Sequence, residues 1–238
     1  MNYKPTYTPF GETAILIEWP AKIDEDIIQD IVSFEKLVAT NQQVLDTIIA
    51  YNSLTIVYAQ LTNYSKTVAQ LKEVYQTKRE AVSKTKKLWQ IPVCYHESFG
   101  IDLKEIATQK ELTIDEVIAL HTAPKYLLYF IGFQPGFLYL GGLNPAIHTP
   151  RKSTPRLRVD KGSVGIGGEQ TGVYPQDSSG GWNLIGKSPI NFFDISKEQP
   201  CFANPGDRIQ FVAIDVFTFT QIEKDVKRGV FHLKFEWI

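Results

Sequence analysis

The sequence predicts an α+β protein: an N-terminal α/β sandwich-like domain followed by a domain of many short strands, a β-barrel or sandwich. In the first part, β-rich runs alternate with amphipathic helical runs, which favours two helices on one face of an antiparallel sheet. From Tyr126 onward the helical period is absent, and Pro or Gly interrupts the short apolar runs. Twelve of the 16 glycines lie between Gly132 and Gly186 among aromatics and arginines, which indicates tight turns around a fixed surface. We expect domains at residues 1–88 and 89–238.

The N-terminal elements follow from local patterns. Asp24 is a helix cap, and apolar residues recur after it at helical spacing. Asn52-Ser53 is a turn joining two short strands. The expected strands are Thr13–Trp19, Thr47–Tyr51, Leu54–Tyr58 and Leu88–Val93, and the two helices carry Ile27, Ile31, Phe34 and Val38, then Val68, Leu71, Val74 and Tyr75.

The second domain is expected to begin with helical structure over residues 101–122, where Thr113 and Glu116 form a capping box. Short strands are then expected at Tyr126–Phe133, Gly162–Ile166, Asn183–Ile185, Ile190–Phe193 and Arg208–Ile214.

Composition excludes several classes of protein. The net charge of −1 argues against nucleic-acid binding through bulk charge, and the basic run at residues 78–87 reads as a solvated helix end and linker. No apolar run reaches the roughly 18 residues of a membrane helix, and the N-terminus lacks a signal-peptide core. Two cysteines make no disulfide framework, so we expect a cytoplasmic protein that binds no membrane.

Two segments of the sequence resemble nucleotide-binding motifs. Gly181–Ser188 matches the phosphate-loop pattern, but neither a preceding strand nor a following helix is expected, so we interpret the match as coincidence. Gly165–Gly172 has the wrong spacing for a dinucleotide fingerprint and favours a tight β turn or backbone that lines a pocket. The histidines show no metal-ligand spacing, so no metal site is expected.

Residues 151–158 hold four cations, beside His148. Arginine offers a planar fork suited to carboxylate or phosphate. A solvated loop and an anion-binding loop remain equally good readings of this segment.

The chain resembles a known family through strings spread over nearly its whole length. They are Gly132–Gly142, Pro150–Arg156, Gly162–Ile166, Gln170–Pro175, Gly181–Gly186 and Pro205–Asp207, with Ile91–Tyr95 and Ser53-Leu54 in the first half. The family is that of the prokaryotic 5-oxoprolinase B subunits, also described as Kip I-like sensor histidine kinase inhibitors and as allophanate hydrolase subunit 1. The sequence departs from the family pattern at Lys152, Asp160-Lys161, Ser179 and Lys187-Ser188.

The resemblance implies a cyclophilin-like β-barrel in the second domain and work with the partner C and A subunits of 5-oxoprolinase. That complex would cleave 5-oxo-L-proline to L-glutamate and hydrolyse ATP. The complex would bind the ATP together with Mg²⁺, and this chain would hold no cofactor of its own. The alternatives are inhibition of histidine kinase autophosphorylation, an allophanate- or urea-processing carboxyltransferase-like role, and a barrel that only scaffolds the C subunit.

Such chemistry requires cations for phosphoryl charge and donors for a substrate carboxylate. We therefore expect anion contacts from Arg151, Arg156 and Lys187, with His148, Gln170 and Tyr174 orienting substrate or moving protons. Trp182 is expected as a pocket wall or a core residue. The pocket backbone would come from Gly136, Gly167 and Gly168. No single catalytic residue is indicated.

Overall fold

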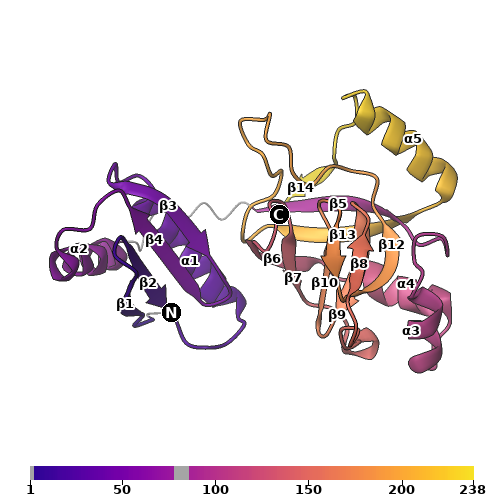
Figure 1. The fold of residues 1–238 in the computed structure, drawn as a ribbon, viewed down its shortest axis with the longest axis horizontal. Coiled ribbons are helices and arrows are strands. Elements are labelled where there is room, and N and C mark those ends of the chain that lie inside the picture. Colours follow the sequence, from indigo (N-terminus) through magenta and orange to yellow (C-terminus); the bar gives the residue numbers. More distant parts are fainter. Residues whose placement is uncertain (1–2, 78–85) are drawn as a thin grey trace. The chain divides into compact units, whose positions relative to one another are not determined.

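A computed structural model describes residues 3–77 and 86–238 of the chain (Figure 1). The chain divides into two compact units, Met1–Thr85 and Lys86–Ile238. The expected boundary between residues 88 and 89 falls just inside strand β5 (Lys87–Cys94). Residues 78–85 of the basic run lie outside the described residues.

The first unit contains a four-stranded antiparallel sheet. Its order is β1 (Thr6–Phe10), β2 (Ala14–Glu18), β4 (Ser53–Tyr58) and β3 (Val44–Ile49). The last three strands and the turn between β3 and β4 agree with expectation. Strand β1 was not expected, and because four of its five residues are exposed it carries no alternating apolar signal.

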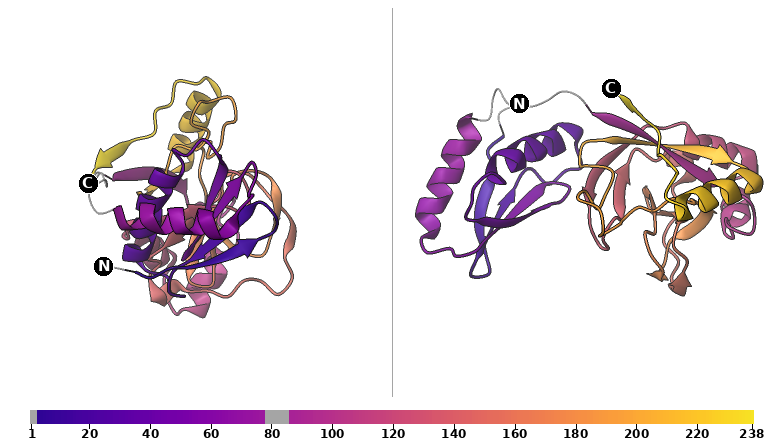
Figure 2. Two further views of the ribbon diagram at one scale, coloured as in Figure 1. Left: turned by 90° about the vertical axis from the view of Figure 1, so that its left-hand side faces the viewer. Right: turned by 90° about the horizontal axis from the view of Figure 1, so that it is seen from above.

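Two helices, α1 (Glu25–Val38) and α2 (Tyr64–Thr77), complete this unit. The Asp24 carboxylate caps α1 by accepting a hydrogen bond from the Asp26 N–H at 2.8 Å, as expected. The apolar stripe of α1 is buried, and α1 lies against β3 and β4 (Figure 2). Helix α2 buries only Leu71, and its Tyr75 ring packs edge-on against Trp19.

The second unit is a closed barrel of seven strands. They follow the order β12, β9, β10, β7, β6, β13 and β5, and pairing of β12 with β5 closes the barrel. The remaining bounds are β6 Tyr126–Ile131, β7 Leu138–Gly141, β9 Ser163–Gly167, β10 Gln170–Val173, β12 Asn183–Lys187 and β13 Arg208–Ile214. The expected α+β class with a C-terminal barrel is confirmed.

Further elements decorate the barrel. Strand β14 (Phe235–Trp237) pairs with β5, while β8 (Arg156–Val159) and β11 (Ser178–Gly180) form a separate two-stranded ribbon. The helices are α3 Leu103–Gln109, α4 Ile114–Thr122, α5 Val216–Lys227 and the short 3₁₀ helix η2 Pro145–Ile147.

Two expectations for this unit need correction. The helical stretch 101–122 is two helices, because Glu111 adopts a left-handed φ of 55° between them; the capping box of Thr113 and Glu116 is present. The strand expected at Ile190–Phe193 is wrong, since this segment is a loop. Ile190 and Phe192 are nevertheless buried, so the apolar residues of this segment indicate packing in the core and not a strand.

The barrel core includes one polar network, centred on His121, which is fully buried at the end of α4. The hydroxyl of Thr171 donates to the Gly165 carbonyl, so it accepts from His121 Nε2, 2.8 Å away. His121 Nδ1 is then an acceptor for the Tyr95 hydroxyl at 2.7 Å. Burial lowers the pKa of His121 to about 3, so the ring is neutral at ordinary pH.

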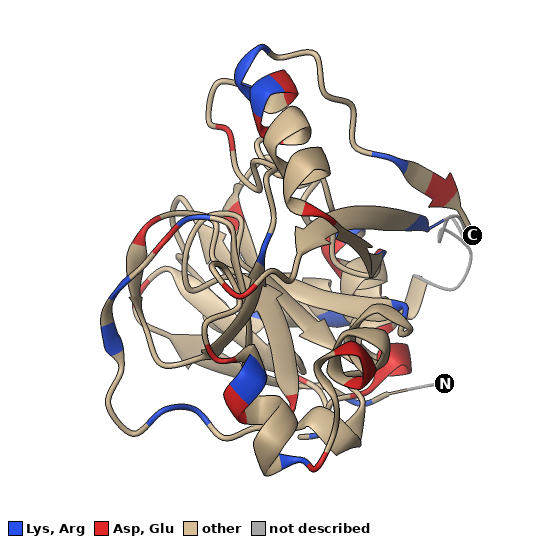
Figure 3. Cartoon of the chain, turned by 90° about the vertical axis from the view of Figure 1, so that its right-hand side faces the viewer, with Lys and Arg blue, Asp and Glu red and all other residues tan. Residues whose placement is uncertain are grey.

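No helix among the described residues is long and apolar enough to span a membrane. Lys and Arg are interspersed with Asp and Glu along the chain in the view of Figure 3.

Candidate functional site

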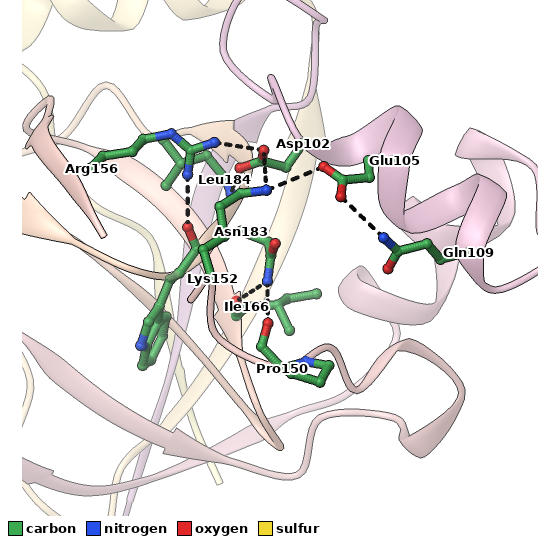
Figure 4. A network of polar contacts seen from close by, with 10 residues as sticks. Asp102, Glu105, Gln109, Pro150, Lys152, Arg156, Ile166, Asn183 and Leu184 are labelled. Carbon is green, nitrogen blue, oxygen red and sulfur yellow. Dashed lines mark hydrogen bonds and ion pairs between the residues drawn. The ribbon is translucent and has the colours of Figure 1, made fainter. Parts of the chain in front are cut away.

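The cationic segment 151–158 is anchored by one buried carboxylate, Asp102, at the start of α3 (Figure 4). Asp102 Oδ1 accepts from Arg156 Nη2 at 2.6 Å and lies 3.1 Å from Lys152 Nζ. Its Oδ2 accepts from the Leu184 backbone N–H at 2.6 Å. The Asp102 side chain makes no cap hydrogen bond to its own helix, so it serves the barrel and the loop instead.

The segment is also tied to the start of β12 by three hydrogen bonds. The Asn183 side chain donates to the Pro150 carbonyl at 2.9 Å, and the Lys152 N–H donates to the Gly181 carbonyl at 2.7 Å. Arg156 Nη1 donates to the Trp182 carbonyl at 3.2 Å. Together with Asp102, these contacts hold residues 150–156 along residues 181–183.

Lys152 reaches a second carboxylate on α3. Its ammonium lies 3.2 Å from Glu105 Oε2, and Glu105 in turn accepts from the Gln109 side chain at 3.0 Å (Figure 4). Partial burial lowers the pKa of Lys152, but the hydrogen bonds to Asp102 and Glu105 outweigh it and raise that pKa above the usual value. Lys152 therefore stays charged and bound inside this cluster.

Arg151 differs from its neighbours in the segment. It is exposed, and none of the described residues forms a hydrogen bond or ion pair with its guanidinium. Burial raises the pKa of Tyr139 and of Tyr174, and the positive charge of Arg151 opposes both shifts. The positive charge of Arg156 opposes the shift at Tyr174 as well, so both arginines lie within electrostatic range of that phenol.

Those rings belong to a small aromatic cluster separate from the main core. Phe137, Tyr174 and Trp182 are buried together with Val159 and Leu184, and Tyr139 packs at the edge. A Cβ at Gly167 would lie 2.5 Å from the Trp182 indole nitrogen, so this glycine lets the ring lie on the backbone of β9. Trp182 and Tyr174 are thus packed side chains.

The other expected site residues are more dispersed. His148 is half-buried, and its Nε2 lies 3.0 Å from the Leu143 carbonyl. Gln170 starts β10 and is half-buried. Lys187 ends β12, lies 3.6 Å from Asp160 Oδ2 and stands over the Phe99 ring.

Of the two glycines not yet placed, Gly136 turns with a φ of 84° where a Cβ would meet Phe193 at 2.7 Å. Gly168 has a φ of 68° with open space around it, and its N–H donates to the Thr149 carbonyl at 2.7 Å. Gly136 therefore serves packing, whereas Gly168 serves the β9–β10 turn.

Neither nucleotide-like string forms its motif. Residues 183–187 of the phosphate-loop string are strand β12, and no helix follows. Residues 165–172 form the β9–β10 hairpin, as expected for a tight turn. Within residues 3–77 and 86–238, no group of three or more His, Cys, Asp or Glu side chains could hold a metal ion.

Asp102 is the residue that sequence reasoning missed. It lies within the stretch interpreted as helical, and an aspartate before a helix normally indicates a cap. Its partners follow it by about fifty residues, so no local pattern connects them.

Comparison with known proteins gives consistent matches. A family model described as carboxyltransferase domain, subdomain C and D, matches residues 5–203. The 5-oxoprolinase B subunit of Escherichia coli O157:H7 is 35% identical over 202 residues, 85% of this chain and 93% of that protein. The 5-oxoprolinase B subunit of Bacillus subtilis (strain 168) is 35% identical over 218 residues, which cover 86% of this chain and 90% of that protein.

Solved structures share the fold. The crystal structure of TTHA0988 matches with a TM-score of 0.73 at 32% identity over 85% of this chain, which spans 39% of the TTHA0988 chain. The K. lactis urea amidolyase structure matches with a TM-score of 0.78 over 99% of this chain and 16% of that chain. At 19% identity, the second match shows the fold alone.

Proposed function

The chain belongs to the family of 5-oxoprolinase B subunits and carboxyltransferase C and D subdomains, and we propose that it is the B subunit of an ATP-dependent 5-oxoprolinase. In this role it works in the cytoplasm with partner A and C subunits, and the complex opens the lactam ring of 5-oxo-L-proline to give L-glutamate. The observation that carries the proposal is 35% identity over nine-tenths or more of relatives that bear this name.

The chemistry needs a group that binds anions. Opening a lactam requires activation of its carbonyl, which phosphoryl transfer from ATP, held with Mg²⁺, would supply. Cations then stabilise the phosphoryl charge, and further donors hold the substrate carboxylate. Arg151 is the best placed of the expected contacts, because Arg156 is already paired with Asp102 and Lys187 with Asp160.

The remaining roles are assigned by chemistry. Gln170 and His148 can orient substrate, whereas Tyr174 and Trp182 support the site from the aromatic cluster. The Gly181–Ser188 string does not fit a nucleotide phosphate, because its lysine ends a strand with no helix after it. We therefore do not propose this string as the ATP site of the complex.

Reconstitution tests this proposal. The chain is co-purified with A and C subunits from the same organism, and glutamate release from 5-oxoproline is measured with and without ATP. We expect ATP-dependent release that is lost when this chain is omitted. Absence of glutamate from a stably assembled complex of all three subunits would contradict the proposal.

A second candidate is a carboxyltransferase-like role in processing allophanate or urea. The carboxyltransferase family model and the fold of the K. lactis urea amidolyase favour it. Urea and allophanate are therefore assayed in parallel with 5-oxoproline, and turnover of either one alone would replace the first proposal. Inhibition of a sensor histidine kinase stays a prediction, tested by autophosphorylation in the presence of the purified chain.

A further inference from the structure

We infer that Asp102 is a positioning residue that divides the cations of segment 151–158 into an inner pair, Lys152 and Arg156, and one outward contact for the substrate carboxylate, Arg151. The inference rests on the proposed function for the identity of the substrate. It assigns the anion contact to one arginine and removes Arg156 from direct substrate binding.

The first support is the charge arrangement around Asp102. Its side chain is only 5% exposed, so a buried carboxylate stands between two cations. A buried charge is costly unless it is paired and hydrogen-bonded, and Asp102 meets that need through Arg156, Lys152 and the Leu184 N–H. An inner cation that turned toward a substrate would leave this buried carboxylate with one cation in place of two.

The second support is the geometry of the backbone on both sides of Arg151. Pro150 is held through its carbonyl by Asn183, and Lys152 is held through its N–H by Gly181. Arg151 therefore sits between two fixed neighbours, which limits the conformational entropy it loses on binding. Its side chain is exposed, so an anion can approach the guanidinium from solvent.

Arg158 supplies a matched control. It belongs to the same segment and is exposed, but it pairs with Asp160 and Asp177, which are themselves about half exposed. Changing Arg158 alters the charge of the segment equally without touching Asp102 or Arg151.

The kinetic test uses the reconstituted complex of the A, B and C subunits. We expect Arg151→Met to raise the KM for 5-oxoproline at least tenfold, Asp102→Asn to raise it several-fold, and Arg158→Met to leave it within twofold. In the double variant, Asp102→Asn should add little to Arg151→Met, because it acts through that arginine. Additive effects, or an unchanged KM in Arg151→Met, would overturn the inference. A rise confined to the KM for ATP would overturn the carboxylate assignment.

A second measurement does not depend on activity. Trypsin cuts after Lys152 and Arg156, and both side chains are held by Asp102. In the full chain, Asp102→Asn should speed these cuts at least tenfold relative to the cut after the exposed Lys227, whereas Arg158→Met should not. Equal rates would show that Asp102 does not fix the segment. If the wild-type complex releases no glutamate, the proposed function fails while this measurement still decides the positioning role.

Discussion

Two polar networks in the barrel unit differ in how they end. The His121 network is neutral and buried, and its polar side chains find partners within the barrel. The Asp102 cluster is charged and lies where the barrel meets segment 151–158, and it ends beside an arginine that no described residue pairs. A network completed inside a barrel specifies the core, whereas one that ends at an exposed cation offers that cation to a ligand.

The largest effect on stability is expected in the His121 network. His121→Ala should lower the free energy of unfolding by about 4 kcal/mol, because it leaves a cavity and removes the acceptor of the buried Tyr95 hydroxyl. Urea denaturation measures the change, with His96→Ala at an exposed position as the control. A loss under about 1 kcal/mol would mean that the His121 network contributes no more to stability than a surface contact does.

The same histidine should make stability depend on pH. The unfolded chain binds this proton near pH 6.5, but the folded chain does not until about pH 3, so the unfolded state binds more protons in between. Stability should therefore fall by about 1.4 kcal/mol per pH unit below 6.5, or roughly 3 kcal/mol by pH 4.

Comparison of the wild type with His121→Gln between pH 7 and pH 4 isolates this contribution. Lowered pKa values at carboxyls such as Asp177, held by the Lys161 N–H, add a dependence of the same sign in both proteins. Parallel curves for the two proteins would exclude a neutral buried histidine.

Substitution in the Asp102 cluster should lower stability less than substitution in the His121 network. Asp102→Asn keeps the shape of the side chain but leaves Arg156 and Lys152 without their shared anion, and should cost about 2 kcal/mol. This is below the usual loss for a fully buried pair, because both cations are about a quarter exposed. Asp160→Asn, at an exposed carboxylate, should change thermal stability by less than about 0.5 kcal/mol. If the two variants are equally destabilised, burial of Asp102 has no special role.

The smallest effect is expected at Arg151. Arg151→Met removes an exposed side chain with no ion pair among the described residues, so it should change unfolding free energy by less than about 0.5 kcal/mol. Thermal unfolding of the variant beside the wild type checks this. A loss above about 1 kcal/mol would show that Arg151 supports the fold, and the contrast between the two networks would disappear.

What the sequence predicted well depends on neighbouring residues. The Asp24 cap, the apolar stripe of α1 and the capping box at Thr113 each act within one or two helical turns, so a local pattern reports them. What it missed depends on distant pairing. Strand β14 is exposed along its length and exists because it pairs with β5, about 150 residues earlier. Helix α5 was also missed, although its Phe219, Ile222 and Val226 recur at helical spacing; Phe219 is buried, and the other two pack partly buried against the barrel core.

The candidate site follows the same rule. The sequence identified the cationic segment and the glycine–aromatic turns, because unusual residue types cluster there. It could not separate Arg151 from Arg156, since the difference is made by a carboxylate on α3. Composition likewise does not show that Tyr174 and Trp182 face each other in a small core of their own.

The closure of the barrel has a consequence for how the chain is made. Strand β5 opens the second unit, yet its partners β12, β13 and β14 are all synthesised roughly ninety residues later or more (Figure 1). The first unit contains all of its own strand partners and can fold while translation continues. Strand β5 therefore stays unpaired, with its apolar residues Trp89, Ile91 and Val93 exposed, until the partner strands have been synthesised. Nascent chains stalled before β12 should therefore be the form that chaperones hold and that aggregates most readily.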